Sequence, residues 1–172
     1  MLIETLRLTI THFSLDMAHD VHLNSLDEDM RRFVPDEVFE TEEEARDAIR
    51  CLIQCYEDPD GPYVYPITLR NGHTNIGYIQ LAKIKEGWEI GYHIAKQYTG
   101  RGFATEAANA FLSYLFRLKK LDSVYGVCLT ENTASRKVLE KCGFHLIFEG
   151  MNDYQGENQR VCKYLYERKV NR

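Results

Sequence analysis

The hydrophobic residues of this chain follow two different periods, and the change between them falls within the stretch Trp88 to Leu121. Trp88 to Ala95 alternates and is rich in β-forming residues, which predicts a strand. From Ala104 to Leu118 the apolar residues recur at helical spacing, which predicts the longest amphipathic helix of the chain. The chain is therefore expected to turn between Lys96 and Phe103.

The same two periods divide the rest of the chain. Further strands are predicted at Thr5 to Phe13, Tyr63 to Arg70, Thr74 to Lys85, Ser123 to Leu129, His145 to Gly150 and Val161 to Glu167. Helices are predicted at Asp16 to Leu26, from the capping box of Thr41 and Glu44 to Tyr56, and at Asn132 to Lys141, with a loop at Arg31 to Glu40. Together these elements predict a single domain over residues 1–172.

Composition narrows the classes of protein that the chain can belong to. Its 172 residues suffice for one domain with a full core, and a formal net charge of −5 argues against a nucleic-acid partner. No apolar run is long enough to span a bilayer and the N-terminus lacks a signal pattern, so a cytoplasmic protein with no membrane partner is expected. The five cysteines form no C-x-x-C pair and lie in apolar patterns, which predicts reduced core thiols; the six histidines show no metal-ligand spacing, so no metal is expected.

Two glycines occupy the turn before the long helix. Gly100 and Gly102 have no Cβ, so the backbone can adopt positive φ and a ligand can approach its N–H groups closely. The first N–H groups of the helix lack intrahelical partners, which makes this turn a candidate phosphate site. A P-loop is excluded because Phe103 follows Gly102, and the dinucleotide fingerprint would need Gly or Ala where Thr105 stands.

The hexapeptide from Gln97 to Gly102 resembles the Q/R-x-x-G-x-G/A signature of the GCN5-related N-acetyltransferases (GNAT). The run NTASRKVLEKCGF from Asn132 to Phe144 is similar to the second cofactor segment of that family, and it follows the glycine turn in the expected order. The runs ETLRLTI, EIGYHI and ATEA resemble the RimJ/RimL-like branch, which acetylates N-terminal residues of ribosomal proteins. This resemblance implies an α/β (α+β) GNAT fold: a mixed, mostly antiparallel sheet of about six to seven strands, splayed between the fourth and fifth strands, with helices on both faces.

The resemblance also implies acetyl-coenzyme A as co-substrate, with its pyrophosphate on the N–H groups from Tyr98 through Thr105. A pantetheine arm would lie along the strand at His93 and Ile94, and Asn132 would bond to it. The implied cofactor-binding residues are His93, Ile94, Gln97, Tyr98, Thr99, Gly100, Arg101, Gly102, Phe103, Ala104, Thr105 and Asn132.

Two catalytic residues are expected. Glu89 is the first choice of general base, with a solvated strand-face charge as the alternative; His93 is a second candidate base or a packing residue, and Glu106 is interpreted as structural. Many family members carry a tyrosine as thiolate-protonating acid where Leu139 stands here, so the hydroxyl of Ser135 is the candidate acid. Phe33, Tyr63, Tyr65 and Tyr154 are either lining of the acceptor site or core residues.

The resulting hypothesis is an acetyl-coenzyme A-dependent N-acetyltransferase that acts on a primary amine, either a peptide N-terminus or a small molecule. A non-catalytic acyl-coenzyme A sensor and an interaction module on the same fold are the alternatives. The identity of the acceptor and the oligomeric state, a homodimer included, stay open.

Overall fold

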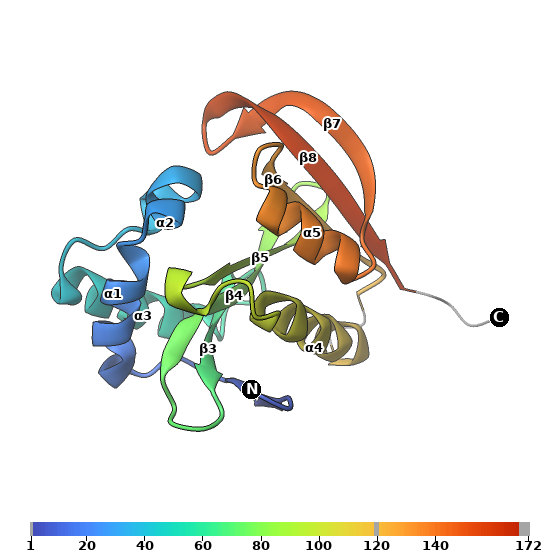
Figure 1. Ribbon diagram of the computed structural model, residues 1–172. Coiled ribbons are helices and arrows are strands. Elements are labelled where there is room, and N and C mark those ends of the chain that lie inside the picture. The colour runs from blue at the N-terminus through green and yellow to red at the C-terminus, as the bar shows by residue number, and fades with distance from the viewer. Residues whose placement is uncertain (1, 119–120, 169–172) are drawn as a thin grey trace.

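The computed structural model describes residues 2–118 and 121–168, which form a mixed sheet of eight strands in the order β1-β2-β3-β4-β5-β6-β8-β7 (Figure 1). The strands are β1 (Ile3–Glu4), β2 (Leu8–Ile10), β3 (Tyr63–Leu69), β4 (Asn75–Ile84), β5 (Gly87–Ile94), β6 (Ser123–Leu129), β7 (His145–Tyr154) and β8 (Glu157–Glu167). The helices are α1 (Ala18–Ser25), α2 (Glu28–Phe33), α3 (Glu42–Cys55), α4 (Phe103–Leu118) and α5 (Thr133–Lys141), with 3-10 turns η1 (Leu15–Met17), η2 (Pro35–Glu37) and η3 (Lys96–Tyr98).

The sheet is divided in its middle. Every neighbouring pair of strands is antiparallel except β5 and β6, which run parallel and are joined by one bridge, Glu89 to Tyr125. β5 and β6 are the predicted fourth and fifth strands, so the mixed, mostly antiparallel, splayed sheet is confirmed. The strand count is eight rather than six or seven because the chain adds the two-residue strand β1.

Helices cover both faces of the sheet, as predicted. Apolar residues of α4 and α5, among them Phe111 and Leu139, pack with one set of strand side chains. On the opposite face Ala18 of α1 and Ile49 of α3 pack with Val64. In Figure 1, α1, α2 and α3 accordingly gather on one side and α4 and α5 on the other.

The first strand is shorter than predicted. Thr5 does not continue it, because its hydroxyl accepts a hydrogen bond from the N–H of Leu8 at 2.9 Å and its own N–H donates to the Leu8 carbonyl. The chain therefore turns at Thr5, and only Leu8–Ile10 forms β2. Leu6, which the alternation places on the buried face, is 87% exposed.

The predicted loop from Arg31 to Glu40 is wrong at its beginning, because α2 extends to Phe33. Asp27 caps this helix by accepting a hydrogen bond from the N–H of Met30 at 2.8 Å. Val34 precedes Pro35, and a residue before proline is disfavoured in helical conformation, so α2 ends there.

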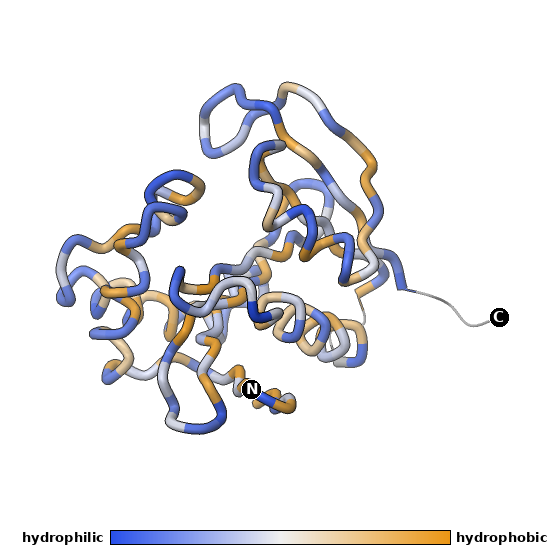
Figure 2. The backbone as a smooth tube through the Cα atoms, viewed as in Figure 1, coloured by the Kyte–Doolittle hydropathy of each residue, from blue (hydrophilic) through white to orange (hydrophobic). Residues whose placement is uncertain are grey.

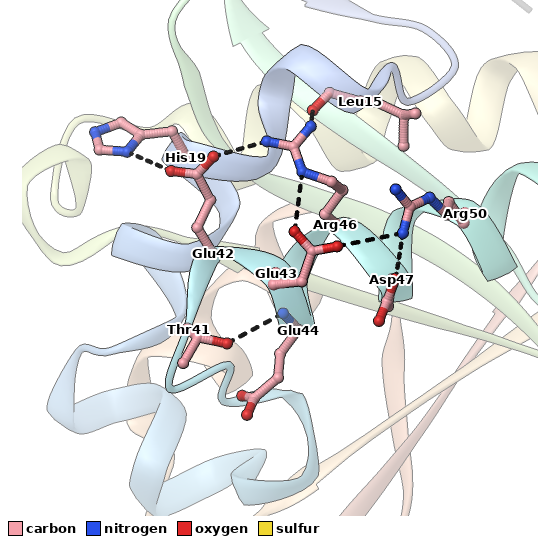
Figure 3. A network of polar contacts seen from close by, with 9 residues as sticks. All are labelled: Leu15, His19, Thr41, Glu42, Glu43, Glu44, Arg46, Asp47 and Arg50. Carbon is pink, nitrogen blue, oxygen red and sulfur yellow. Dashed lines mark hydrogen bonds and ion pairs between the residues drawn. The ribbon is translucent and has the colours of Figure 1, made fainter.

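The capping box at the start of α3 is confirmed in its main contact (Figure 3). Thr41 Oγ1 accepts from the N–H of Glu44, and Glu44 reaches back to the N–H of Glu40 at 2.7 Å. Arg46 donates to the Leu15 carbonyl and to Glu42, which ties η1 to α3. The α1–α3 layer is thus fixed to the sheet independently of α4 and α5.

The last two strands are longer than the predicted His145 to Gly150 and Val161 to Glu167. They continue as a hairpin through Gln155 and Gly156, with φ of 55° and 81°, which are the two positive values of a type I′ turn. Gln-Gly is not the usual Asn-Gly or Asp-Gly pair of such turns, so the sequence did not predict a tight turn here. The turn is mostly hydrophilic in Figure 2.

Candidate active site

A cleft of about 1070 Å³ opens where β5 and β6 part. Its walls come from the end of β5, the glycine turn, the start of α5, the α2–η2 segment and the β7–β8 hairpin. Most of the residues that the sequence singled out line it: Glu89, His93, Ile94, Tyr98, Thr99, Gly100, Gly102, Phe103, Ala104, Thr105, Asn132 and Ser135. Gln97 and Arg101 are exposed and are not part of its lining.

The glycine turn presents unused N–H groups to this cleft. Gly100 and Gly102 have φ of 75° and 80°, a region that residues with a Cβ adopt at a cost. A Cβ at Gly100 would meet no atom within 4 Å, and one at Gly102 only the Arg7 side chain at 3.7 Å, so open space adjoins the turn. The first α4 bond to the turn is Glu106 N–H to the Gly102 carbonyl, and within the described chain the N–H groups of residues 100–105 have no acceptor. This donor set fits a pyrophosphate.

Glu106 and Arg101 lie on the outer side of the turn. The Glu106 carboxylate accepts from Thr5 Oγ1 at 2.6 Å and from the backbone and guanidinium of Arg7 at 3.0 and 2.6 Å. Burial raises the pKa of Glu106, but these hydrogen bonds outweigh it and leave the pKa lowered. Glu106 therefore fastens the N-terminal segment to α4, in agreement with its structural interpretation. The Arg101 carbonyl accepts from Arg7 at 2.9 Å.

The edge of β5 that faces β6 is free beyond the bridge at Glu89. For Ile90 to Ile94, no further bridge to β6 occurs among the described residues, whereas these residues pair with β4 throughout. An extended arm could add to this edge as a strand does. The edge adjoins the glycine turn in the chain, so one ligand can contact both.

Ser135 lies in the first turn of α5, where its N–H donates to the capping oxygen Asn132 Oδ1 at 3.0 Å. Its hydroxyl lies 3.1 Å from the hydroxyl of Tyr92, which also donates to the Ser135 carbonyl at 3.1 Å. Burial raises the pKa of Tyr92, so this phenol stays protonated. Sequence reasoning missed Tyr92, since a contact across 43 positions leaves no local signal.

Leu139 is 2% exposed and packs on β6. A Cβ at Gly126 would approach its Cδ2 to 2.6 Å, so Leu139 occupies the space above that glycine. The side chain has no polar atom, whereas Ser135 and Tyr92, which line the same cleft, carry hydroxyl groups.

Glu89 is partly buried in the cleft, and with Tyr125 it forms the one bridge found between the sheet halves in residues 2–118 and 121–168. Burial raises its pKa to about 7, although Lys163 acts in the opposite direction. Lys163 itself pairs with Glu86 at 3.3 Å. Glu89 is therefore not a fully solvated strand-face charge, and near neutral pH it can both accept and release a proton.

Another part of the cleft lies between η2 and the β7–β8 hairpin. Glu37 of η2 lies beside Tyr78, whose hydroxyl favours the carboxylate, but burial outweighs this effect and leaves the pKa of Glu37 raised. His93 Nε2 lies 3.3 Å from Asp27 Oδ2. Phe33 and Tyr154 line this part, whereas Tyr63 and Tyr65 are buried in the core. Sequence reasoning missed Glu37 because it stands in a segment predicted as loop.

The cysteines and histidines agree only in part with expectation. Cys128, Cys142 and Cys162 are buried thiols, but Cys51 is exposed, so the prediction of a core thiol was wrong there. Within residues 2–118 and 121–168, no three His, Cys, Asp or Glu side chains are grouped to hold a metal ion. The helices of the same ranges include none with the length and apolarity to cross a membrane.

Comparisons with known proteins agree with this geometry. Residues 7–145 match the family model described as an acetyltransferase (GNAT) domain. The uncharacterized N-acetyltransferase YnaD of Bacillus subtilis is 31% identical over 143 residues, 82% of this chain and 81% of YnaD. The crystal structure of a GNAT-family acetyltransferase from Bacillus anthracis has a TM-score of 0.84 at 29% identity, covering 97% of this chain and 98% of that one. The ribosomal L7/L12 α-N-protein acetyltransferase RimL, solved with coenzyme A, shares the fold with a TM-score of 0.83 at 19% identity, covering 97% and 98%.

Proposed function

Because this chain belongs to the GNAT acetyltransferase family, and is thus an N-acetyltransferase, we propose that its cleft binds acetyl-coenzyme A and acetylates a primary amine that enters beside Glu89. The observation that carries the proposal is one cleft that joins the free N–H groups of the glycine turn, the free edge of β5, Glu89 and Ser135. We also propose that residues 1–172 form a single catalytic domain. Amines of peptide N-termini and of small molecules both meet this chemistry.

The binding residues divide by the part of the ligand that they contact. The N–H groups of residues 100–105 hold the pyrophosphate, because they are unpaired donors at the positive end of the α4 dipole. The N–H groups of Tyr98 and Thr99, expected to take part, instead donate to the Ala95 and Lys96 carbonyls. The backbone of His93 and Ile94 pairs with the pantetheine arm along the free edge of β5, and Asn132 reaches the same arm from the start of α5. Gln97 and Arg101, outside the cleft lining, contribute through their backbone or from its rim.

Acetyl-coenzyme A, when bound, supplies an acetyl group on an activated thioester. Glu89 accepts the proton of the incoming ammonium, directly or through water, since its pKa of about 7 keeps part of it ionised at neutral pH. Ser135 Oγ donates a proton to the departing sulfur and takes in its place, directly or through water, the second proton that the attacking nitrogen loses when the amide forms. The Tyr92 hydroxyl is a positioning group: its proton is accepted by the Ser135 carbonyl, which leaves the Ser135 proton available.

The test measures free-thiol release from acetyl-coenzyme A with a panel of peptide and small amines. We expect Ser135→Ala to lower kcat by on the order of 10²-fold or less, because water can substitute for part of the acid. Tyr92→Phe should lower kcat by about tenfold or less, and both variants should keep the dissociation constant for acetyl-coenzyme A. Ser113→Ala is the matched control, since Ser113 is an exposed helical serine bonded to Asn109.

Each outcome decides between the alternatives. Tight acetyl-coenzyme A binding with no turnover of any amine would identify a sensor rather than an enzyme. Turnover that is unaltered in Ser135→Ala would remove Ser135 from the mechanism while leaving the enzyme in place.

A further inference from the structure

Glu37 is a carboxyl group in the cleft for which the proposed chemistry has no use. It is partly buried, and burial raises its pKa, as expected for a charge withdrawn from water without a cation beside it. No ion pair of Glu37 occurs among the described residues, whereas other charges at the rim are already paired. These pairs are Arg32 with Glu131 at 2.9 Å, Lys96 with Asp29 at 2.9 Å and Lys163 with Glu86 at 3.3 Å.

The groups that face Glu37 hold it in place without neutralising it. The Tyr78 hydroxyl lies beside the Glu37 carboxyl and favours its ionised form, and Asp36 precedes Glu37 in η2. His93 is within electrostatic range, but its Nε2 already lies against Asp27. A carboxylate has about four acceptor positions, so Glu37 keeps capacity for a further donor.

The surrounding wall is aromatic. Phe33, Tyr78 and Tyr154 line the same part of the cleft as Glu37. Burial raises the pKa of Tyr154 to about 12, and the charges of both Glu89 and Glu37 add to that shift, so its ring lies within range of both carboxyl groups. Aromatic rings beside a carboxylate form a favourable environment for an alkylammonium group.

From this arrangement we infer that Glu37 forms a second cation subsite, so that the preferred acceptor is a primary amine carrying another positive charge, as in a diamine. One ammonium group lies at Glu89 and reacts, while the other binds Glu37 between the aromatic side chains. The polyanionic co-substrate cannot serve as this cation. The inference rests on the proposed function, because it names the acceptor class of the same cleft.

The test compares 1,4-diaminobutane with butylamine, which has the same chain and one charge fewer. Calorimetry on the protein loaded with coenzyme A measures binding of each amine, and thiol release gives kcat and KM separately. We expect the wild type to bind the diamine at least about tenfold more tightly, and Glu37→Gln to lose this preference through KM while butylamine changes by less than about threefold. Gln has nearly the same size and shape as Glu and no charge, so the fold is kept. Asp36→Asn removes an exposed neighbouring charge outside the cleft lining and is the matched control.

Equal binding of the two amines by the wild type, or an equal loss of both in Glu37→Gln, would overturn the subsite. A diamine preference in binding that depends on Glu37, without thiol release, would uphold the subsite and contradict the proposed catalysis. Turnover of butylamine and the diamine at the same kcat/KM would uphold the proposed catalysis and contradict the subsite.

Discussion

The ionisation of Glu89 is expected to affect both the catalytic rate and the free energy of unfolding. Its pKa of about 7 makes it half ionised near neutral pH, so we expect kcat/KM to rise through an apparent pKa near 7. The acceptor amine gives a separate rise at higher pH, since ordinary alkylamines titrate near 10. In Glu89→Gln the step near pH 7 should disappear and kcat should fall by about 10² to 10³. A pH profile of thiol release for both proteins checks this, and a surviving step would assign the base to another group.

The same shift has a defined sign for stability. The folded protein holds the Glu89 proton more tightly than the unfolded chain, whose glutamates have their ordinary pKa near 4.5. The contribution of Glu89 is therefore complete below about pH 4.5 and is lost as pH rises to about 7, by at most about 3 kcal/mol. Urea unfolding at pH 5 and pH 8 should show a smaller loss in Glu89→Gln than in the wild type, with Glu37 keeping part of the slope.

Residues whose role depends on neighbours in the chain were predictable. Asn132 caps α5 and Gly100 and Gly102 adopt positive φ, as expected from their local pattern. Tyr92 and Glu37 were not predictable, because their roles depend on residues that only the fold brings near. Tyr92 lies beside Ser135, and Glu37 lies beside Tyr78.

At the scale of elements, the η3–α4 turn combines backbone conformation with ligand binding, and the two can be separated. Gly102→Val places a β-branched side chain at φ of 80° and over the free N–H groups, so both stability and affinity for acetyl-coenzyme A should fall. Gly156, with φ of 81° in the β7–β8 turn and open space beside it, offers a matched control.

We expect Gly102→Val and Gly156→Val to lose a similar 1 to 3 kcal/mol, roughly, from backbone strain, with the affinity loss confined to Gly102→Val. Calorimetric titration with acetyl-coenzyme A and urea unfolding measure the two effects. Equal affinities for both variants would mean that the turn only connects β5 to α4.

Elements with a strong period were predicted almost to the residue, while those set by tertiary context were not. Ser123 to Leu129 is β6 as predicted, because this short segment is rich in the β-forming residues Val124, Tyr125 and Val127. α2 was missed since six residues carry almost no period, and its main signal is the single cap at Asp27. The β7–β8 hairpin grew beyond its apolar segments because cross-strand pairing, rather than the sequence period, extends its ends.

At the scale of the whole molecule, the cleft lies between two halves of a sheet that share a single bridge among the described residues. A ligand that contacts β5, α4 and α5 at once binds the folded state only, and therefore stabilises it. At about 100 times its dissociation constant, acetyl-coenzyme A should add roughly 2.7 kcal/mol and raise Tm by several degrees. NAD and ATP should do much less in the same melting experiment, and a larger shift with either nucleotide would contradict the assignment of the turn.

Cys128 lies in the wall of the cleft, 2% exposed, and burial raises its pKa to about 11. At pH 8 so little of it is thiolate that alkylation should run roughly 100-fold slower than at an ordinary cysteine. Exposed Cys51 and partly exposed Cys55 should react first, and after both are replaced by serine the slow reaction of Cys128 becomes visible by mass spectrometry of its own peptide. Amines or coenzyme A that fill the cleft should slow it further, while a rate indifferent to them would place their binding elsewhere. The alkylation rate of Cys128 thus reports whether the cleft is occupied, so acceptors can be screened before any turnover is known.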